Sequence, residues 1–260
     1  HPRVLVLAGA GSQLHLVEEF AGRGRYFVNS VTDILLRPGA VVVHEKIVQE
    51  SRTGGHVGAV RVRQENDSVF SSVNLSRAPG LVRNDLHVAL SGKGADCTLS
   101  GMAWGEDDGH VDHHTVVDHA QPRCTSRQLY KGVLDGCSRG VFCGRVVVRP
   151  GAQKTSAWQT SKNLLLSADA LASSIPQLEI NADDVQCRHG SAIGQMDENM
   201  LFYLQSRGIA AQDARQVLTL AFACEILDRL RLPELRSRLH HQLLSGGAGK
   251  PDPAAGVEAM

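Results

Sequence analysis

The stretch GVFCGRVVVRPGAQKTSAWQTSKNLLLS, residues 140–167, shows the pattern that decides the fold. Two runs of strand-like composition, 140–151 and 156–167, are separated by a short segment, 152–155, that contains Gln153 and Lys154. Apolar residues in these runs do not recur with the helical period of 3.6, and turn-forming residues bound each run. This combination indicates β-strands.

Similar runs occur upstream, at 40–48, 58–64, 68–76, 86–92 and 97–105, and little helical periodicity is present from about residue 3 to 194. The Asn-Gly pair that closes tight hairpins does not occur, whereas a Gly-Ala pair recurs before strands at 39–40, 94–95 and 151–152. A sandwich, a barrel and a solenoid would all fit a helix-poor chain. The recurring pair and the scarcity of hairpin turns favour a β-helix, that is, a solenoid of stacked rungs.

After Gly194 the pattern becomes helical. Asp197 and Glu198 precede an apolar run that ends with Arg207 before Gly208, which is the charge order expected of a helix. The following segment spaces apolar residues helically at Val217, Leu218, Leu220, Ala221, Cys224 and Leu227, and after Pro233 at Leu235, Leu239 and Leu243. We therefore predict a β-helix core over 1–194, a C-terminal helical domain over 195–245 and a flexible tail over 246–260.

The charge balance and the cysteine content restrict the functional class. The 27 basic and 27 acidic side chains cancel, which argues against binding to a nucleic-acid backbone. No apolar run reaches the length of a membrane span, and the N-terminus lacks the pattern of a signal peptide. The six cysteines form no CxxC motif, so free thiols in a reducing compartment are expected. These features predict a soluble, cytoplasmic protein without a nucleic-acid or membrane partner.

Histidines and aspartates are most dense in the segment GHVDHHTVVDHA, residues 109–120. Imidazole and carboxylate groups ligate zinc and iron, so a metal site is one interpretation. However, side chains alternate between the faces of a strand, which would place His110, Asp112 and His114 opposite His113 and His119. We therefore favour a polar ladder between rungs. Carboxylates near 107–118 also leave open an alternative function as a β-helix carbohydrate-active enzyme.

A second candidate lies in NADDVQCRHGSAIGQ, residues 181–195, where Cys187 and His189 are two positions apart. Cys97, Cys137, Cys143 and Cys224 follow apolar patterns and are interpreted as small buried hydrophobes. Cys187 instead lies in a polar, loop-like segment beside Arg188, which would favour its thiolate form. A thiolate next to an imidazole suits an iron–sulfur species. A structural cysteine on a last strand, with a histidine between rungs, is the alternative.

The segment from Gln128 to Ile209 resembles the SufB/SufD family of the SUF iron–sulfur cluster assembly system. The upstream segments PRVLVLAGAG, YFVNSVTDI, LVRNDLHVALSG and HAQPRCTSRQLYKG are similar to the same family, so the resemblance covers roughly residues 2–232. In the CRHG motif, Gly190 favours the SufD branch over the SufB branch, and Arg188 departs from the small residue common at that position.

The resemblance implies a right-handed parallel β-helix followed by a C-terminal α-helical bundle, with the family's N-terminal helical region missing. It also implies a non-enzymatic scaffold that pairs with a SufB-like paralogue, or with a second copy of itself, through the β-helix edge. A SufC-like ABC ATPase would dock on the helices, for which we select Leu218, Phe222 and Leu227. Cys187 and His189 would hold a transient iron–sulfur cluster or iron, and no tightly bound cofactor is expected.

Overall fold

The computed structural model describes residues 1–78 and 80–244, and the chain separates into two compact units, His1–Met196 and a second unit that begins at Asp197. The segment 246–260, predicted to be a flexible tail, lies outside the described residues.

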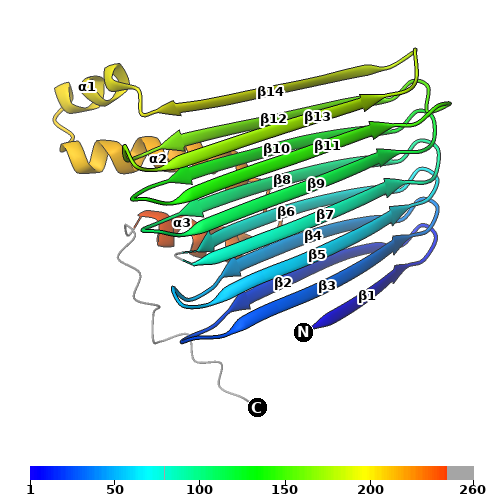
Figure 1. Ribbon diagram of the computed structural model, residues 1–260, viewed down its shortest axis with the longest axis horizontal. Coiled ribbons are helices and arrows are strands. Elements are labelled where there is room, and N and C mark those ends of the chain that lie inside the picture. Colours follow the sequence, from blue (N-terminus) through cyan, green and yellow to red (C-terminus); the bar gives the residue numbers. More distant parts are fainter. Residues whose placement is uncertain (79, 245–260) are drawn as a thin grey trace. The chain divides into compact units, whose positions relative to one another are not determined.

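The first unit is a parallel β-solenoid (Figure 1). Odd-numbered strands form one seven-stranded sheet and even-numbered strands form the other, and all neighbouring pairs with a given register are parallel. Each strand therefore pairs with the strand two elements earlier, so that two successive strands make one rung. The predicted β-helix is confirmed. The strands are β1 (Arg3–Ala8), β2 (Gln13–Ala21), β3 (Phe27–Leu36), β4 (Val41–Gln49), β5 (Gly55–Gln64), β6 (Val69–Ala78), β7 (Leu81–Leu90), β8 (Asp96–Gly105), β9 (His110–His119), β10 (Thr125–Leu134), β11 (Arg139–Val148), β12 (Ser156–Leu165), β13 (Leu171–Ile180) and β14 (Gln186–Gln195).

The length of a rung varies, which explains why the repeat is hard to see in the sequence. Equivalent positions on successive rungs of the even-numbered sheet are occupied by Phe70, Cys97, Ser126 and Ala157. They are separated by as few as 27 positions, between Phe70 and Cys97, and by as many as 31, between Ser126 and Ala157. The stacking is regular, but the turns absorb the insertions, as surface connections can.

The recurring Gly-Ala pair marks one kind of turn between the two sheets. Gly39, Gly94 and Gly151 have φ angles of 69°, 73° and 83°, a left-handed conformation that glycine adopts without steric cost. The alanine that follows each of them is fully buried. A residue with a side chain can take the place of the glycine, as Arg123 does with a φ of 60° before the buried Cys124. The turn geometry, rather than the dipeptide, is what repeats.

The interior between β2, β4 and β5 contains charged side chains. His44 lies 2.8 Å from the carboxylate of Glu18, and His56 lies 2.9 Å from that of Glu50. Lys46 is 1% exposed, and no described residue forms a hydrogen bond with its Nζ, which lies 5.1 Å from the centre of the Phe20 ring. Burial lowers the pKa of Lys46 to about 8, although Glu18 and Glu50 attract its charge.

The second unit contains α1 (Glu198–Ser206), α2 (Ala211–Leu227) and α3 (Pro233–Leu244). The Asp197 side chain caps α1 by accepting from the backbone N–H groups of Asn199 and Met200, and Gly208 follows α1 with a φ of 86°. The buried side of α2 differs from the predicted stripe. Val217 is 46% exposed, whereas the buried positions are Ala214, Thr219, Ala223, Ile226 and Leu227. Apolar residues surround α2, so periodicity alone did not identify its packed face.

The charge on Lys46 is expected to reduce the stability of the protein at neutral pH. A pKa displaced from 10.5 to about 8 corresponds to a cost of about 3 kcal/mol. The unfolded state binds this proton more tightly than the folded state does. The loss of folding free energy is therefore complete below pH 8, and it disappears as the pH rises to 10.5, the pKa of the lysine in the unfolded chain. Lys46→Met should therefore increase the free energy of unfolding by about 1–3 kcal/mol at pH 7. The difference from the wild type should narrow towards pH 10, as measured by urea denaturation.

The exposed Lys162 on β12 offers a matched control, and Lys162→Met should change the free energy of unfolding by less than about 0.5 kcal/mol. If Lys46→Met lowers the stability at every pH, the charge of Lys46 makes a net favourable contribution and this expectation is wrong.

Candidate functional site

The candidate site lies on β14, one of the two strands that end the solenoid. β14 pairs with β12 and is the last strand of the even-numbered sheet, while β13 is the last strand of the other sheet (Figure 1). Cys187 and His189 are therefore part of a strand and not of the loop that the sequence suggested. The polar composition was misleading, because an end strand does not need two apolar faces.

The alternation of β14 places both candidate ligands on its inward face. Cys187 is paired in register with Ala157 and packs against a buried cluster that includes Val146 and Val148. His189 follows two positions later on the same face, in register with Gln159. Cys187 is half-buried, whereas His189 is exposed. The structure therefore brings a thiol and an imidazole together on one face at the open end of the solenoid.

The electrostatic environment of Cys187 differs from the expectation. Burial raises the pKa of the Cys187 thiol, so the free chain favours the neutral form. Arg188, which was expected to stabilise the thiolate, lies on the opposite face of β14 in register with the exposed Trp158. Metal binding would have to displace the thiol proton, as it does at thiolate sites in general.

These donors do not make a complete metal site within this chain. Among the described residues, no group of three or more His, Cys, Asp or Glu side chains is arranged to hold a metal ion. Iron–sulfur clusters take four protein ligands as a rule. Cys187 and His189 fit such a group chemically, and its further donors would lie outside the described residues.

The histidines of β9 divide between the two faces, as predicted. His113 and His119 point inward and are 3% and 0% exposed, and their Nε2 atoms lie 3.0 Å from the hydroxyl of Ser76 and 2.8 Å from that of Ser126. On the outer face, His114 pairs with Asp112 at 2.8 Å. Burial lowers the pKa of His113 to about 3 and that of His119 to about 4. The segment is a polar ladder and does not converge on a metal.

The carboxylates near 107–118 are not arranged as a catalytic pair. Each of them is paired with an arginine from another rung, at distances of 2.8–3.3 Å: Asp107 and Asp108 with Arg52, Asp112 with Arg83, and Asp118 with Arg149. A glycosidase needs one carboxyl group that keeps a proton and a second that remains a free base or nucleophile. The ion pairs show no two of these carboxylates facing a common space, so the carbohydrate-active alternative has no structural support.

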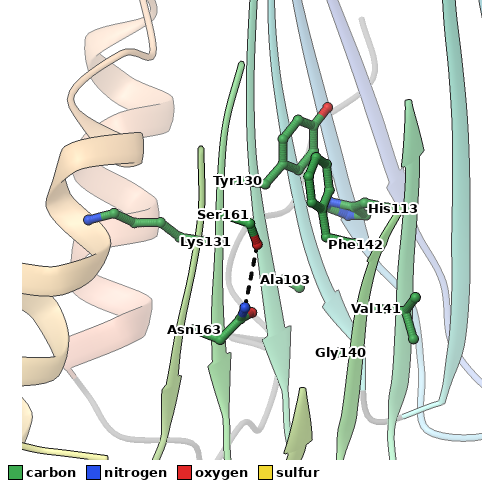
Figure 2. Close-up of a pocket in the computed structure, with 9 residues that line it drawn as sticks. All are labelled: Ala103, His113, Tyr130, Lys131, Gly140, Val141, Phe142, Ser161 and Asn163. Carbon is green, nitrogen blue, oxygen red and sulfur yellow. Dashed lines mark hydrogen bonds between the residues drawn. The ribbon is translucent and has the colours of Figure 1, made fainter. Parts of the chain in front are cut away.

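A small cavity lies between the two sheets (Figure 2). The rings of His113, Tyr130 and Phe142 gather on one side of it, and Asn163 donates a 3.4 Å hydrogen bond to Ser161 on another. Lys131 points away from the other labelled side chains. The cavity has room for no more than about one water molecule, so it is not a substrate pocket.

The turn between β10 and β11 contains Gly136-Cys137-Ser138-Arg139-Gly140, which matches the G-x-S-x-G spacing of a hydrolase nucleophile elbow. An elbow connects a strand to a helix and exposes its serine, but this turn connects two strands and Ser138 is fully buried. Cys137, which was expected to be buried, is exposed in the same turn. The match is therefore coincidental.

Residues 1–222 match the family described as SUF system FeS cluster assembly, SufBD core domain. This chain belongs to the SufBD family. Its relatives include the chloroplastic protein ABCI7 of Arabidopsis thaliana, which is 34% identical over 247 residues that cover 94% of this chain and 52% of that protein. The iron–sulfur cluster assembly protein SufD of Escherichia coli is 31% identical over 243 residues, covering 92% of this chain and 57% of that protein. The chain thus spans about half the length of these relatives.

Membership of the SufBD family agrees with the parallel solenoid and the three helices that follow it, and it confirms the resemblance found in the sequence. No helix in the described ranges, 1–78 and 80–244, is both long and apolar enough to cross a membrane.

The structure places the three residues selected for ATPase docking at different depths in α2. Leu227 is fully buried, so it packs within the chain, whereas Leu218 and Phe222 are half-buried. The apolar side chains displayed on the helices are instead Met200, Phe202, Tyr203 and Val217, with Phe202 71% exposed.

Two buried glutamines inside the solenoid of this SufBD chain have no signal in the sequence. Gln128 and Gln159 are 4% and 1% exposed and occupy equivalent positions on successive rungs, directly before His189. The pairing register of β10, β12 and β14 would have shown that both glutamines lie in one column with His189. Buried glutamines in such a column are unusual. The sequence alone did not contain that register.

The buried imidazoles predict a loss of stability in acid. Because the pKa values of His113 and His119 are lowered to about 3 and 4, the unfolded state binds more protons than the folded state below about pH 6.5. Each histidine should reduce the free energy of unfolding by about 1.4 kcal/mol per pH unit below pH 6. A double substitution, His113→Gln with His119→Gln, should flatten this dependence in urea denaturation between pH 4.5 and 6.5.

The same comparison between pH 7 and 8 serves as the control. Both imidazoles are almost entirely neutral in both states at the upper end of this range, so the pH dependences of the two proteins should become parallel as the pH approaches 8. An equally steep acid dependence in the double variant would show that other groups are responsible.

Proposed function

We propose that this chain is a non-enzymatic scaffold in iron–sulfur cluster assembly, whose open solenoid end contributes Cys187 and His189 to a nascent cluster or to its iron. One observation carries the proposal: two donors lie on the inward face of an end strand, while the described part of the chain offers no third. The iron or cluster is the cargo of the assembly.

The remaining ligands are proposed to come from a SufB-like paralogue that packs against the same end. β13 and β14 have neighbours on one side only, and unpaired strand edges tend to recruit another chain. Apolar side chains are exposed on these two strands at Leu171, Ile175, Ile180 and Ile193, each between 44% and 54% exposed. A partner that covers this end would bury those side chains and surround the two donors. A second copy of this chain is the other occupant to test.

The helical unit is proposed to dock a SufC-like ABC ATPase. Exposed apolar side chains on α1 and α2, among them Phe202 and Val217, support this assignment, because a docked partner would remove them from water. Leu218 and Phe222 would lie next to this surface, and Leu227 would support it from inside.

Loss of either donor should weaken iron retention on the assembled scaffold. His189→Ala and Cys187→Ser are each expected to reduce the affinity for iron at least about tenfold, because even the loss of a residue that only supports a ligand commonly costs 10–100-fold. The measurement is iron retained after anaerobic reconstitution with a SufB-like partner, a SufC-like ATPase and a cysteine desulfurase.

Ser191→Ala is the matched control, since Ser191 lies on the same face two positions beyond His189 and carries no strong iron ligand. Unchanged iron retention in both donor variants would overturn the proposed role of this end. A sizing experiment with and without the SufB-like chain distinguishes the heterologous pair from a homodimer.

Docking of the ATPase should depend on apolar residues of α2 that are exposed, such as Val217, or half-buried, such as Leu218. Val217→Asp and Leu218→Asp are each expected to abolish co-purification with a SufC-like ATPase, in the presence and in the absence of ATP, while leaving the helical circular dichroism unchanged. Gln212→Asp, an exposed polar substitution near the start of α2, is the control and should retain binding. Retained binding in both apolar variants would exclude this surface.

A further inference from the structure

Gln159 on β12 has an unusual environment for a buried amide. Its side chain is 1% exposed, yet neither its Oε1 nor its Nε2 has a hydrogen-bond partner among the described residues. A buried amide without a partner is unfavourable, and an apolar side chain of similar volume would avoid that cost. The amide therefore calls for an explanation other than packing.

The backbone makes specific room for this amide. It extends across the interior towards Gly144 on β11 of the opposite sheet, where a Cβ atom would lie only 2.0 Å from Nε2 and 2.9 Å from Cδ of Gln159. Gly144 thus leaves the space that the amide occupies. The glutamine is held between the sheets, one strand before the open end.

His189 is the residue directly above this amide. The two are paired in register on neighbouring strands, and Ala157 and Cys187 show that this face points inward. Neighbouring strands lie about 4.8 Å apart, so the imidazole and the amide are within reach of each other. His189 is exposed, and its ring makes no hydrogen bond with the residues that the structure describes, so no such bond opposes a rotation of the ring towards Gln159.

We propose that Gln159 is a positioning residue for His189, an inference that rests on the proposed function of His189 as an iron ligand. The amide oxygen of Gln159 accepts a hydrogen bond from one ring N–H of His189. This bond fixes the tautomer and leaves the other ring nitrogen, with its lone pair, directed at the incoming iron or cluster. When a partner covers the open end, water no longer competes for the ring N–H and the bond becomes stronger.

The first test measures the tautomer of His189 in the full chain without any metal. In protein labelled with ¹⁵N-histidine, long-range ¹H–¹⁵N correlation spectra identify the protonated ring nitrogen, and His189→Ala assigns the signal. The wild type should show a single tautomer, and Gln159→Leu should show a mixture of the two. Gln128→Leu is the matched control, because Gln128 is buried in the same column but one rung farther from His189. The proposal fails if the Gln159→Leu and wild-type spectra of His189 are the same.

The second test compares stability with iron affinity. Gln159→Leu removes a buried amide without a partner, so its midpoint of thermal unfolding should be equal to or higher than that of the wild type. Its affinity for iron in the reconstituted scaffold should nevertheless fall by about 10–100-fold. A residue with a purely structural role would not separate these two quantities, and a parallel loss of stability and affinity would count against positioning.

The two proposals can fail separately. If His189→Ala leaves iron retention unchanged, His189 is not a ligand, whatever the tautomer spectra show. If His189→Ala lowers retention but Gln159→Leu does not, His189 is a ligand that Gln159 does not position.

Discussion

Parallel pairing in register between successive rungs is the constraint on which the rest of the structure depends. Each strand of the solenoid satisfies its backbone hydrogen bonds with the strands before and after it, so the column of side chains above one residue is fixed by that ladder. Ala157 determines that Cys187 points inward, and Gln159 determines the same for His189. A slip of one residue in β14 would turn both donors to the outer face.

The same constraint leaves the ends of the solenoid incomplete. An interior rung is covered on both sides, but β13 and β14 have a neighbour on one side only. Inward-facing residues of the last rung are therefore accessible, although their equivalents one rung earlier are buried, as the contrast between the exposed His189 and the buried Gln159 shows. A solenoid end thus displays core positions, which suits a site completed by a second molecule.

The interior is more polar than a sheet-on-sheet core needs to be. Three groups of buried polar side chains follow one another along the stack: the charges near Lys46, the imidazoles of His113 and His119, and the column of Gln128 and Gln159. The backbone hydrogen bonds to the strands on both sides hold these groups in place. The buried aliphatic residues that pack beside them offset the free-energy cost of burying polar groups. Gln159, in register with His189, is the buried polar group for which we propose a functional reason.

The sequence by itself determined the fold class, the change from strands to helices near residue 196, the alternation within β9 and the family. Local periodicity and turn chemistry carry that information, because their effects reach only neighbouring residues. Gly39 sets the turn before Ala40, and Asp197 caps the start of α1. Only the tertiary structure decided that Cys187 lies on a strand with a raised thiol pKa, that Cys137 is exposed and that Leu227 is buried. It also decided that Gln159 lies beneath His189. These properties depend on pairings between residues about 30 positions apart, and rungs of unequal length hide such pairings from any pattern along the chain.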